Sequence, residues 1–357
     1  MSRIKPTCNK IIGAAGAALV LLGAGVLAAG EGLHSFGLGA GGPALQARVV
    51  VVEDLHAVKT FVPDADRVSA MFDRALLYFT HKSTVPEAWR GMVSTNDVIG
   101  IKVYSAPGPV AGTRPAVAEA VARSLLAAGI PGTNIIIWDK NFPDLKSAGF
   151  VDLARRLGIG VESAADAGYD PKVFSEKPFI GFLVYGDLEF NKHLEGRGRK
   201  SFVSHLLTKR LTKIVNIAPM LSHNSAGVSG NIFGLAVGAV DNVLRFEARP
   251  ALMAEGIPDI YLLPEVGDRV VLSVVDALIC QYQGESQSLL HYSTVLNELR
   301  LSKDPVALDV LSLREINRQR TSVGMAARTN ANEIYFNASI AELGTYDESD
   351  INIEKVP

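Results

Sequence analysis

Residues 98–140 read VIGIKVYSAPGPVAGTRPAVAEAVARSLLAAGIPGTNIIIWDK, and this stretch decides the fold class. It opens with an apolar run typical of a buried strand, VIGIKVY, and closes with a second one, NIIIWDK. Between them a Gly/Pro-rich loop leads into a helical segment, with Thr113 as the expected cap, Pro115 in the first turn and Gly129 at the end. Strand, helix and strand in this order predict a βαβ unit with parallel strands.

The same alternation continues on both sides of this stretch. Further strands are predicted at residues 48–54, 213–221, 269–282 and, as a closing edge strand, 351–356; further helices are predicted at residues 66–79, 153–157 and 305–320. The runs KIVNIAPML and RVVLSVVDALICQY are mostly apolar and show no polar alternation, which suits strands covered on both faces. We therefore predict an α/β fold with a mostly parallel sheet covered by helices on both faces, and ligands beyond the carboxyl ends of its strands.

The N-terminus has the pattern of an export signal. Arg3, Lys5 and Lys10 precede residues 11–30, which carry no charge and are just long enough for a membrane-spanning helix. The positive flank predicts a cytoplasmic N-terminus, with the rest of the chain on the extracytoplasmic or periplasmic side. Small residues at 28–30 offer a cleavage site, so a retained membrane anchor and a cleaved signal both stay open.

This pattern predicts three parts: a signal peptide or anchor at residues 1–30, a flexible Gly/Ala-rich linker at 31–47, and a single α/β domain at 48–357. The formal net charge of −2 shows no chain-wide basic character, so we expect no nucleic-acid partner. Cys8 and Cys280 are the only cysteines, which is too few for an iron–sulfur cluster.

The first candidate loop follows the strand at residues 98–104. Lys102, Ser105, Gly108, Thr113 and Arg114 lie in or beside it and are candidate cofactor-binding residues. The loop enters a helix N-terminus, where free backbone N–H groups and the helix dipole favour an anion. The alternative is an ordinary Gly/Pro turn in which Thr113 caps the helix.

The second candidate loop, residues 222–231, reads SHNSAGVSGN and separates two apolar runs. His223 and Asn224 are candidate catalytic residues, and His223 could serve as a metal ligand, a general base or a donor to a bound anion. A structural hydrogen-bonding role for His223 is the alternative. Candidate cofactor-binding residues in this loop are Ser225, Gly227, Ser229 and Gly230.

Acidic residues follow the other strands. Asp276 is a candidate catalytic residue, and Asp139 and Asp304 could join His223 as ligands of a divalent metal. Asp304 precedes Pro305, however, so a helix cap is the alternative for it, and Asp309 lies one turn further on. The identity of any cofactor stays open, whether a metal or an anionic small molecule.

Four ordered blocks together resemble the domain-of-unknown-function 362 family: residues 98–140, 214–234, 274–285 and 301–320. The resemblance extends over residues 48–357. It implies that many relatives are exported and that some carry ferredoxin-like iron–sulfur modules, but it implies no particular reaction. The family pattern has lysines at two positions near the histidine, where this chain has Leu221 and Phe233, and the ferredoxin cysteines are absent.

Two hypotheses of function follow. In the first, the protein is a metal- or cofactor-dependent extracytoplasmic enzyme linked to redox chemistry. In the second, it is a non-catalytic, membrane-tethered binding or accessory subunit that has a protein partner and a degenerate family site. Both depend on whether His223 and the acidic residues converge in one crevice.

Overall fold

A computed structural model of the protein describes residues 46–177, 181–192, 197–247, 249–285, 287–328 and 332–357. The chain from residue 46 onward forms one compact unit. The expected signal or anchor at residues 1–30 lies outside the described residues, as does nearly all of the expected linker. Within the described ranges no helix is both long and apolar enough to cross a membrane.

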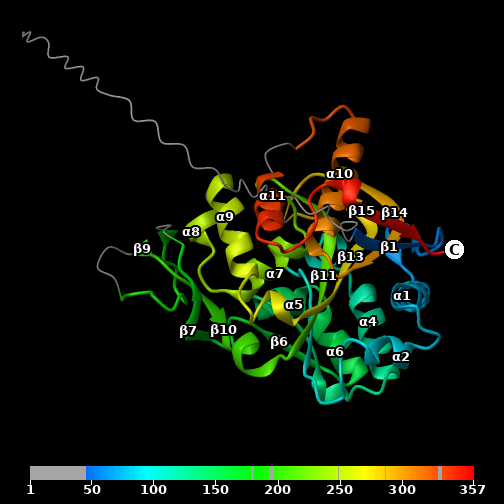
Figure 1. The fold of residues 1–357 in the computed structure, drawn as a ribbon, viewed down its shortest axis with the longest axis horizontal. Helices are drawn as coiled ribbons and strands as arrows, with labels where there is room; N and C mark the ends of the chain where they lie inside the picture. Colours follow the sequence, from blue (N-terminus) through cyan, green and yellow to red (C-terminus); the bar gives the residue numbers. More distant parts are fainter. Residues whose placement is uncertain (1–45, 178–180, 193–196, 248, 286, 329–331) are drawn as a thin grey trace, which may run out of the picture. The chain divides into compact units, whose positions relative to one another are not determined.

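The main sheet of the described chain has nine strands (Figure 1). Eight of them form a continuous path, in the order β15 (Ile351–Lys355), β1 (Ala47–Glu53), β14 (Ser293–Ser302), β13 (Val270–Gln281), β11 (Lys213–His223), β4 (Ile99–Lys102), β5 (Ile135–Asp139) and β6 (Gly160–Ser163). The ninth, β12 (Gly227–Val228), pairs with the end of β11. The predicted edge strand at the C-terminus is therefore confirmed as β15.

Strand directions confirm the predicted α/β class with a mostly parallel sheet. From β13 through β11, β4 and β5 to β6, all neighbours run parallel, and β15 is parallel to β1. β14 is the exception, because it runs antiparallel to both β1 and β13. Most side chains in its first half are only half-buried, so the sequence lacked the continuous apolar run that marked the other strands.

Helices cover both faces of the sheet, and alternate residues of each strand divide between the two cores. In β1, Val50 and Val52 face one core while Val49 and Val51 face the other. Helices of the first core are α1 (Ala65–Thr80), α2 (Val85–Arg90), α4 (Pro115–Ala127), α5 (Phe142–Ser147) and α6 (Phe150–Leu157). Helices of the second core are α7 (Asn231–Ala239), α8 (Leu244–Glu247), α9 (Pro250–Tyr261), α10 (Pro305–Ser322) and α11 (Asn332–Ile340).

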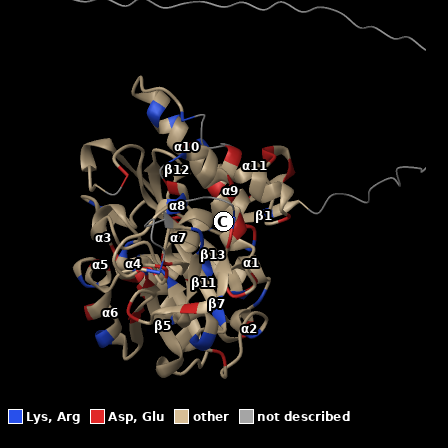
Figure 2. Ribbon diagram, turned by 90° about the vertical axis from the view of Figure 1, so that its left-hand side faces the viewer, with Lys and Arg blue, Asp and Glu red and all other residues tan. Residues whose placement is uncertain are grey.

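Short elements complete the fold. Small antiparallel pairs join β7 (Tyr169–Ser175) to β10 (Ser201–Ser204), β8 (Gly181–Phe182) to β9 (Arg197–Gly198), and β2 (Val58–Lys59) to β3 (Val62–Pro63). A short helix, α3 (Gly108–Ala111), lies inside the first candidate loop. Basic and acidic positions are interspersed along the ribbon (Figure 2).

Candidate functional site

The first candidate loop is attached at its start to the end of β5. Asp139 accepts hydrogen bonds from the backbone N–H and the hydroxyl of Ser105, at 2.7 and 2.6 Å. The Lys102 ammonium lies 2.8 Å from the other carboxylate oxygen of Asp139, and both side chains are buried. The charge of Lys102 is therefore balanced inside the protein, and this lysine is not available to a ligand.

The end of the same loop is attached to β13. Asp276 accepts hydrogen bonds from the backbone N–H and from Nη1 of Arg114, both at 2.9 Å, and the pair is buried. Thr113 donates to the carbonyl of Ile217 at 2.9 Å and accepts from a backbone N–H, and the cap position of α4 is Arg114. The prediction of Thr113 as helix cap was thus wrong, because its hydroxyl links the loop to β11 instead.

These contacts give the loop a structural role. Both of its cations are paired with buried carboxylates, which removes the positive charge that an anion would need. Gly108 begins α3 with φ of +77°, a conformation that favours glycine. Asp276, expected as a catalytic group, has its oxygens occupied by Arg114 and the N–H of Leu278.

The expected metal group of His223, Asp139 and Asp304 does not form. His223 and Asp139 lie at carboxyl ends of parallel strands, whereas β14 runs in the opposite direction and brings Asp304 to the other edge of the sheet. There Asp304 caps α10, accepting from the N–H of Ala307, and also accepts from the N–H of Thr345. No three His, Cys, Asp or Glu residues in the described part of the chain are grouped so that they could hold a metal ion.

His223 ends β11, and its ring is oriented by the turn that follows. Nδ1 accepts hydrogen bonds from the backbone N–H groups of Ser225 and Ala226, at 3.2 and 3.0 Å. In the neutral ring the proton therefore sits on Nε2, since Nδ1 faces two donors. A metal ion or a proton accepted at Nε2 would force a proton onto Nδ1 and break both bonds. Of the three expected roles for His223, donation to a ligand fits this geometry best.

The surroundings of His223 favour its neutral form. Burial lowers its pKa, Arg328 acts in the same direction, and Glu285 opposes them. The ring of Phe233 lies 4.4 Å from the His223 ring, and Leu221 is fully buried. These are the positions where the family resemblance implied lysines, so apolar side chains replace charged ones beside the histidine.

The glycines and serines of the second loop serve its backbone geometry. Gly227 has φ of +76° and pairs with His223 in the turn to β12. A Cβ at Gly230 would overlap the carboxylate of Asp309, which accepts from the N–H groups of Asn231 and Ile232 and so caps α7. The space beside Gly230, predicted as a cofactor-binding residue, is therefore occupied by an acidic side chain of α10. Ser225 contributes its N–H to His223, and Ser229 is buried.

A cluster around His223 includes residues that sequence reasoning missed. We call it the His223 site, and its members are His223, Asn224, Gln283, Glu285, Arg320 and Arg328. Nη2 of Arg328 donates to Oδ1 of Asn224 at 2.7 Å and to Oε1 of Gln283 at 3.1 Å. The Arg320 guanidinium donates to the carbonyl of Tyr282 at 3.0 Å and also to Gln283. Glu285 accepts from the N–H of Asn224 and lies 4.0 Å from Nδ1 of His223.

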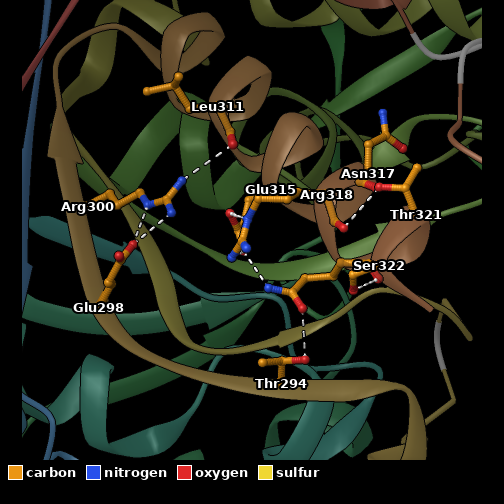
Figure 3. Close-up of polar contacts among 10 residues, drawn as sticks. Thr294, Glu298, Arg300, Leu311, Glu315, Asn317, Arg318, Thr321 and Ser322 are labelled. Atoms are coloured by element: carbon orange, nitrogen blue, oxygen red, sulfur yellow. Dashed lines mark hydrogen bonds and ion pairs between the residues drawn. The ribbon is translucent and has the colours of Figure 1, made fainter.

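Helix α10 positions the two arginines. Asn317 exchanges hydrogen bonds with the backbone of Arg328, accepting at 2.8 Å and donating at 3.3 Å. Gln319 holds the same helix against β14 by accepting from Thr294 at 3.1 Å (Figure 3). The polar face of α10 thus carries Arg320 and the following segment to the carboxyl ends of β11 and β13.

The His223 site has two guanidinium groups and one carboxylate. Arg328 is half-buried, and among the described residues it makes no ion pair. Burial lowers its pKa, repulsion from Arg320 adds to the effect, and attraction to Glu285 opposes it. Glu285 has φ of +49°, an uncommon conformation for a residue with a side chain and one often found near functional sites.

The fold and this cluster define an α/β protein with a polar site beyond the carboxyl ends of its central strands. The model of one family, described as "Domain of unknown function (DUF362)", matches residues 99–314. The chain therefore belongs to this family, as the resemblance implied.

Other comparisons add little. A crystal structure of a Thermotoga maritima protein, from the Northeast Structural Genomics Consortium, aligns with 14% identity and a TM-score of 0.31. The alignment covers 61% of this chain and 51% of that one, so the chain spans about half of that protein. No curated protein matches the sequence.

Proposed function

We propose that this protein is an extracytoplasmic, membrane-tethered binding or accessory protein, and that its His223 site binds an anionic small molecule. The observation that carries the proposal is the half-buried Arg328 guanidinium, which has no ion pair among the described residues. Glu285 is the only carboxylate that acts on Arg328 within the His223 site, and it makes no direct ion pair with this guanidinium among the described residues. A desolvated cation that is only partly balanced is unfavourable, and a bound anion would relieve it.

The neighbouring groups suit the same ligand. His223 offers a neutral Nε2–H, while its Nδ1 is held by backbone donors. Oδ1 of Asn224 faces Arg328, which leaves its Nδ2 as a further donor. A carboxylate or phosphate oxygen accepts such bonds, and bonds to a charged acceptor are stronger than neutral ones. The Glu285 carboxylate would repel the anionic group of the ligand and so direct it toward the two arginines.

The enzyme hypothesis has less support. It needs carboxylates that can bind a metal or transfer a proton, but Asp139 and Asp276 are each engaged with a buried cation. It also needs His223 to accept a proton or a metal at Nε2, which its two backbone donors oppose. A binding function requires neither a free carboxylate nor a proton acceptor at Nε2 of His223.

Binding can be tested by isothermal titration calorimetry on the full chain in a mild detergent. The probes are inorganic phosphate, sulfate, acetate, succinate and citrate. We expect saturable binding of at least one of them, weakened by salt, and a loss of at least about tenfold in affinity, equivalent to about 1.4 kcal/mol, for Arg328→Ala. Arg314→Ala is the matched control, because Arg314 lies on α10, is largely exposed and pairs with Glu348.

Two results would count against the proposal: no probe binds to the wild-type chain, or Arg314→Ala weakens binding as much as Arg328→Ala. The location is tested separately. N-terminal sequencing of the mature protein and extraction of membranes at high pH distinguish a retained anchor from a cleaved signal. A chain found only in the cytoplasmic fraction would overturn the extracytoplasmic assignment.

A further inference from the structure

A second polar cavity, separate from the His223 site, lies beyond the ends of β5 and β6. Lys140 follows β5 directly, and Ala165 follows shortly after β6; both line a cavity of about 250 Å³. In α/β folds with parallel strands, ligands bind in this position. We call it the Lys140 pocket. It is lined mainly by Lys140, Tyr169, Tyr185, Asp187, Asp241 and Asn242.

The walls of the pocket are held in place by Asp241. Its carboxylate accepts hydrogen bonds from the backbone N–H groups of Leu188, Phe202 and Asn242, at 2.8, 2.8 and 2.6 Å. Three separate segments of the chain are thereby fixed around one buried side chain. A cavity with preformed walls loses little conformational entropy when a ligand enters.

Three polar side chains of the pocket have hydrogen-bonding capacity that the described residues do not use. Asn242 is 1% exposed, and neither Oδ1 nor Nδ2 of its side chain makes a hydrogen bond within the described structure. A buried polar group without a hydrogen-bond partner costs about 1–3 kcal/mol of stability, so we expect this amide to have a partner that a ligand can supply. Among the described residues the Lys140 ammonium makes one hydrogen bond, to the carbonyl of Asp241 at 2.8 Å, which leaves two N–H donors for a ligand. Asp187 uses one oxygen, for the N–H of Val184.

The mixed charges of the pocket disfavour simple ions. The two carboxyl groups of Asp187 and Asp241 disfavour an anion, although burial raises the pKa of both and so weakens this repulsion. A divalent cation would meet the Lys140 ammonium, and the described residues include no group of three metal ligands. What remains is a neutral ligand whose groups both donate and accept hydrogen bonds.

We infer that the Lys140 pocket binds a neutral polyhydroxylated ligand of about monosaccharide size. Each hydroxyl both donates and accepts, which matches the free amide of Asn242, the ammonium of Lys140 and the carboxylate of Asp187. Tyr185 is 91% exposed at the rim and offers an aromatic face to the C–H groups of a sugar ring. The cavity is smaller than the about 300–1,000 Å³ of sites for drug-sized ligands, so it suits a single ring.

The test is calorimetric titration of the full chain in mild detergent with glucose, galactose, mannose and N-acetylglucosamine, with glycerol as a probe too small to fill the pocket. We expect saturable binding of at least one sugar and a loss of about tenfold or more in Asn242→Leu, equivalent to about 1.4 kcal/mol. Because Asn242→Leu removes an unpaired amide, its unfolding midpoint without sugar should stay level or rise. A structural role for the amide would lower that midpoint.

A second variant keeps the test valid if Asn242→Leu folds poorly. Tyr185→Ala changes an exposed side chain and should weaken sugar binding several-fold, whereas Phe182→Ala, which removes an exposed aromatic ring outside the pocket, should not. Arg328→Ala should also leave sugar binding unchanged, because it belongs to the His223 site. Failure of all four sugars to bind, or equal effects of Tyr185→Ala and Phe182→Ala, would overturn the inference.

Discussion

The buried pair of Arg114 and Asp276 is the strongest test of whether the carboxylate of a central strand serves the fold or a reaction. Asp276 is fully buried, the Arg114 side chain is 2% exposed, and their closest atoms lie 2.9 Å apart. Asp276→Asn keeps the volume and an acceptor oxygen but leaves the guanidinium buried without a counter-charge. Removing one partner of a buried ion pair costs about 3–5 kcal/mol, and we expect Asp276→Asn to lower the free energy of unfolding by an amount in this range.

Urea unfolding at neutral pH measures this loss, provided the transition is two-state. Arg155→Ala is the matched control, because the pair of Arg155 and Asp152 has the same 2.8 to 2.9 Å geometry on the surface, with side chains 74% and 75% exposed. We expect that variant to cost at most about 0.5 kcal/mol. The double variant Arg114→Met with Asp276→Asn should cost less than the two single changes together. If Asp276→Asn costs no more than Arg155→Ala, the carboxylate is not structural and a catalytic role returns.

Two further predictions concern buried titratable groups. Burial raises the pKa of Asp309 to about 7 from an unperturbed 3.8, so the folded protein holds a proton that the unfolded chain releases. The contribution of Asp309 to stability therefore falls as pH rises from about 4 to about 7, by at most about 4 kcal/mol, and then levels off. The unfolding midpoints of the wild type and of Asp309→Asn should approach each other or cross over this pH range. Parallel pH profiles of the two proteins would contradict the raised pKa of Asp309. Burial also raises the pKa of the Cys280 thiol, which makes it unreactive. In a Cys8→Ser variant, a thiol reagent should therefore label Cys280 only after the protein unfolds. Rapid labelling of the native protein would show that the core is open at Cys280.

The class of fold could be predicted because it depends on local patterns. Apolar runs and cap signals in residues 98–140 correspond to β4, α4 and β5, and the continuous runs at 213–221 and 269–282 correspond to β11 and β13. The strand β14 was not predicted, because its half-buried first half has no continuous apolar run. Without this antiparallel strand between β13 and α10, Asp304 was expected near the carboxyl ends of the parallel strands rather than at their opposite ends.

The candidate site was predicted only in part. The loop with His223 was identified from its composition, but the partners that decide its chemistry are far away in sequence: Arg328 contacts Asn224 across 104 positions, and Arg114 contacts Asp276 across 162. Neither pair has a local signature. The cap was displaced by one residue because Thr113 had a better partner in the carbonyl of Ile217.

The partners of the charged residues beyond the central strands separate those that build the fold from those available to a ligand. Lys102 and Arg114 have the residue type and position of anion-binding groups, yet each is neutralised by a buried aspartate within 3 Å. Arg328 has a less conspicuous place in the sequence, after the end of α10, but its guanidinium meets only amide oxygens among the described residues. Position at a strand end is therefore a weaker indicator of function than an unbalanced charge, because a fold that buries its strand ends must pair most of the charges there.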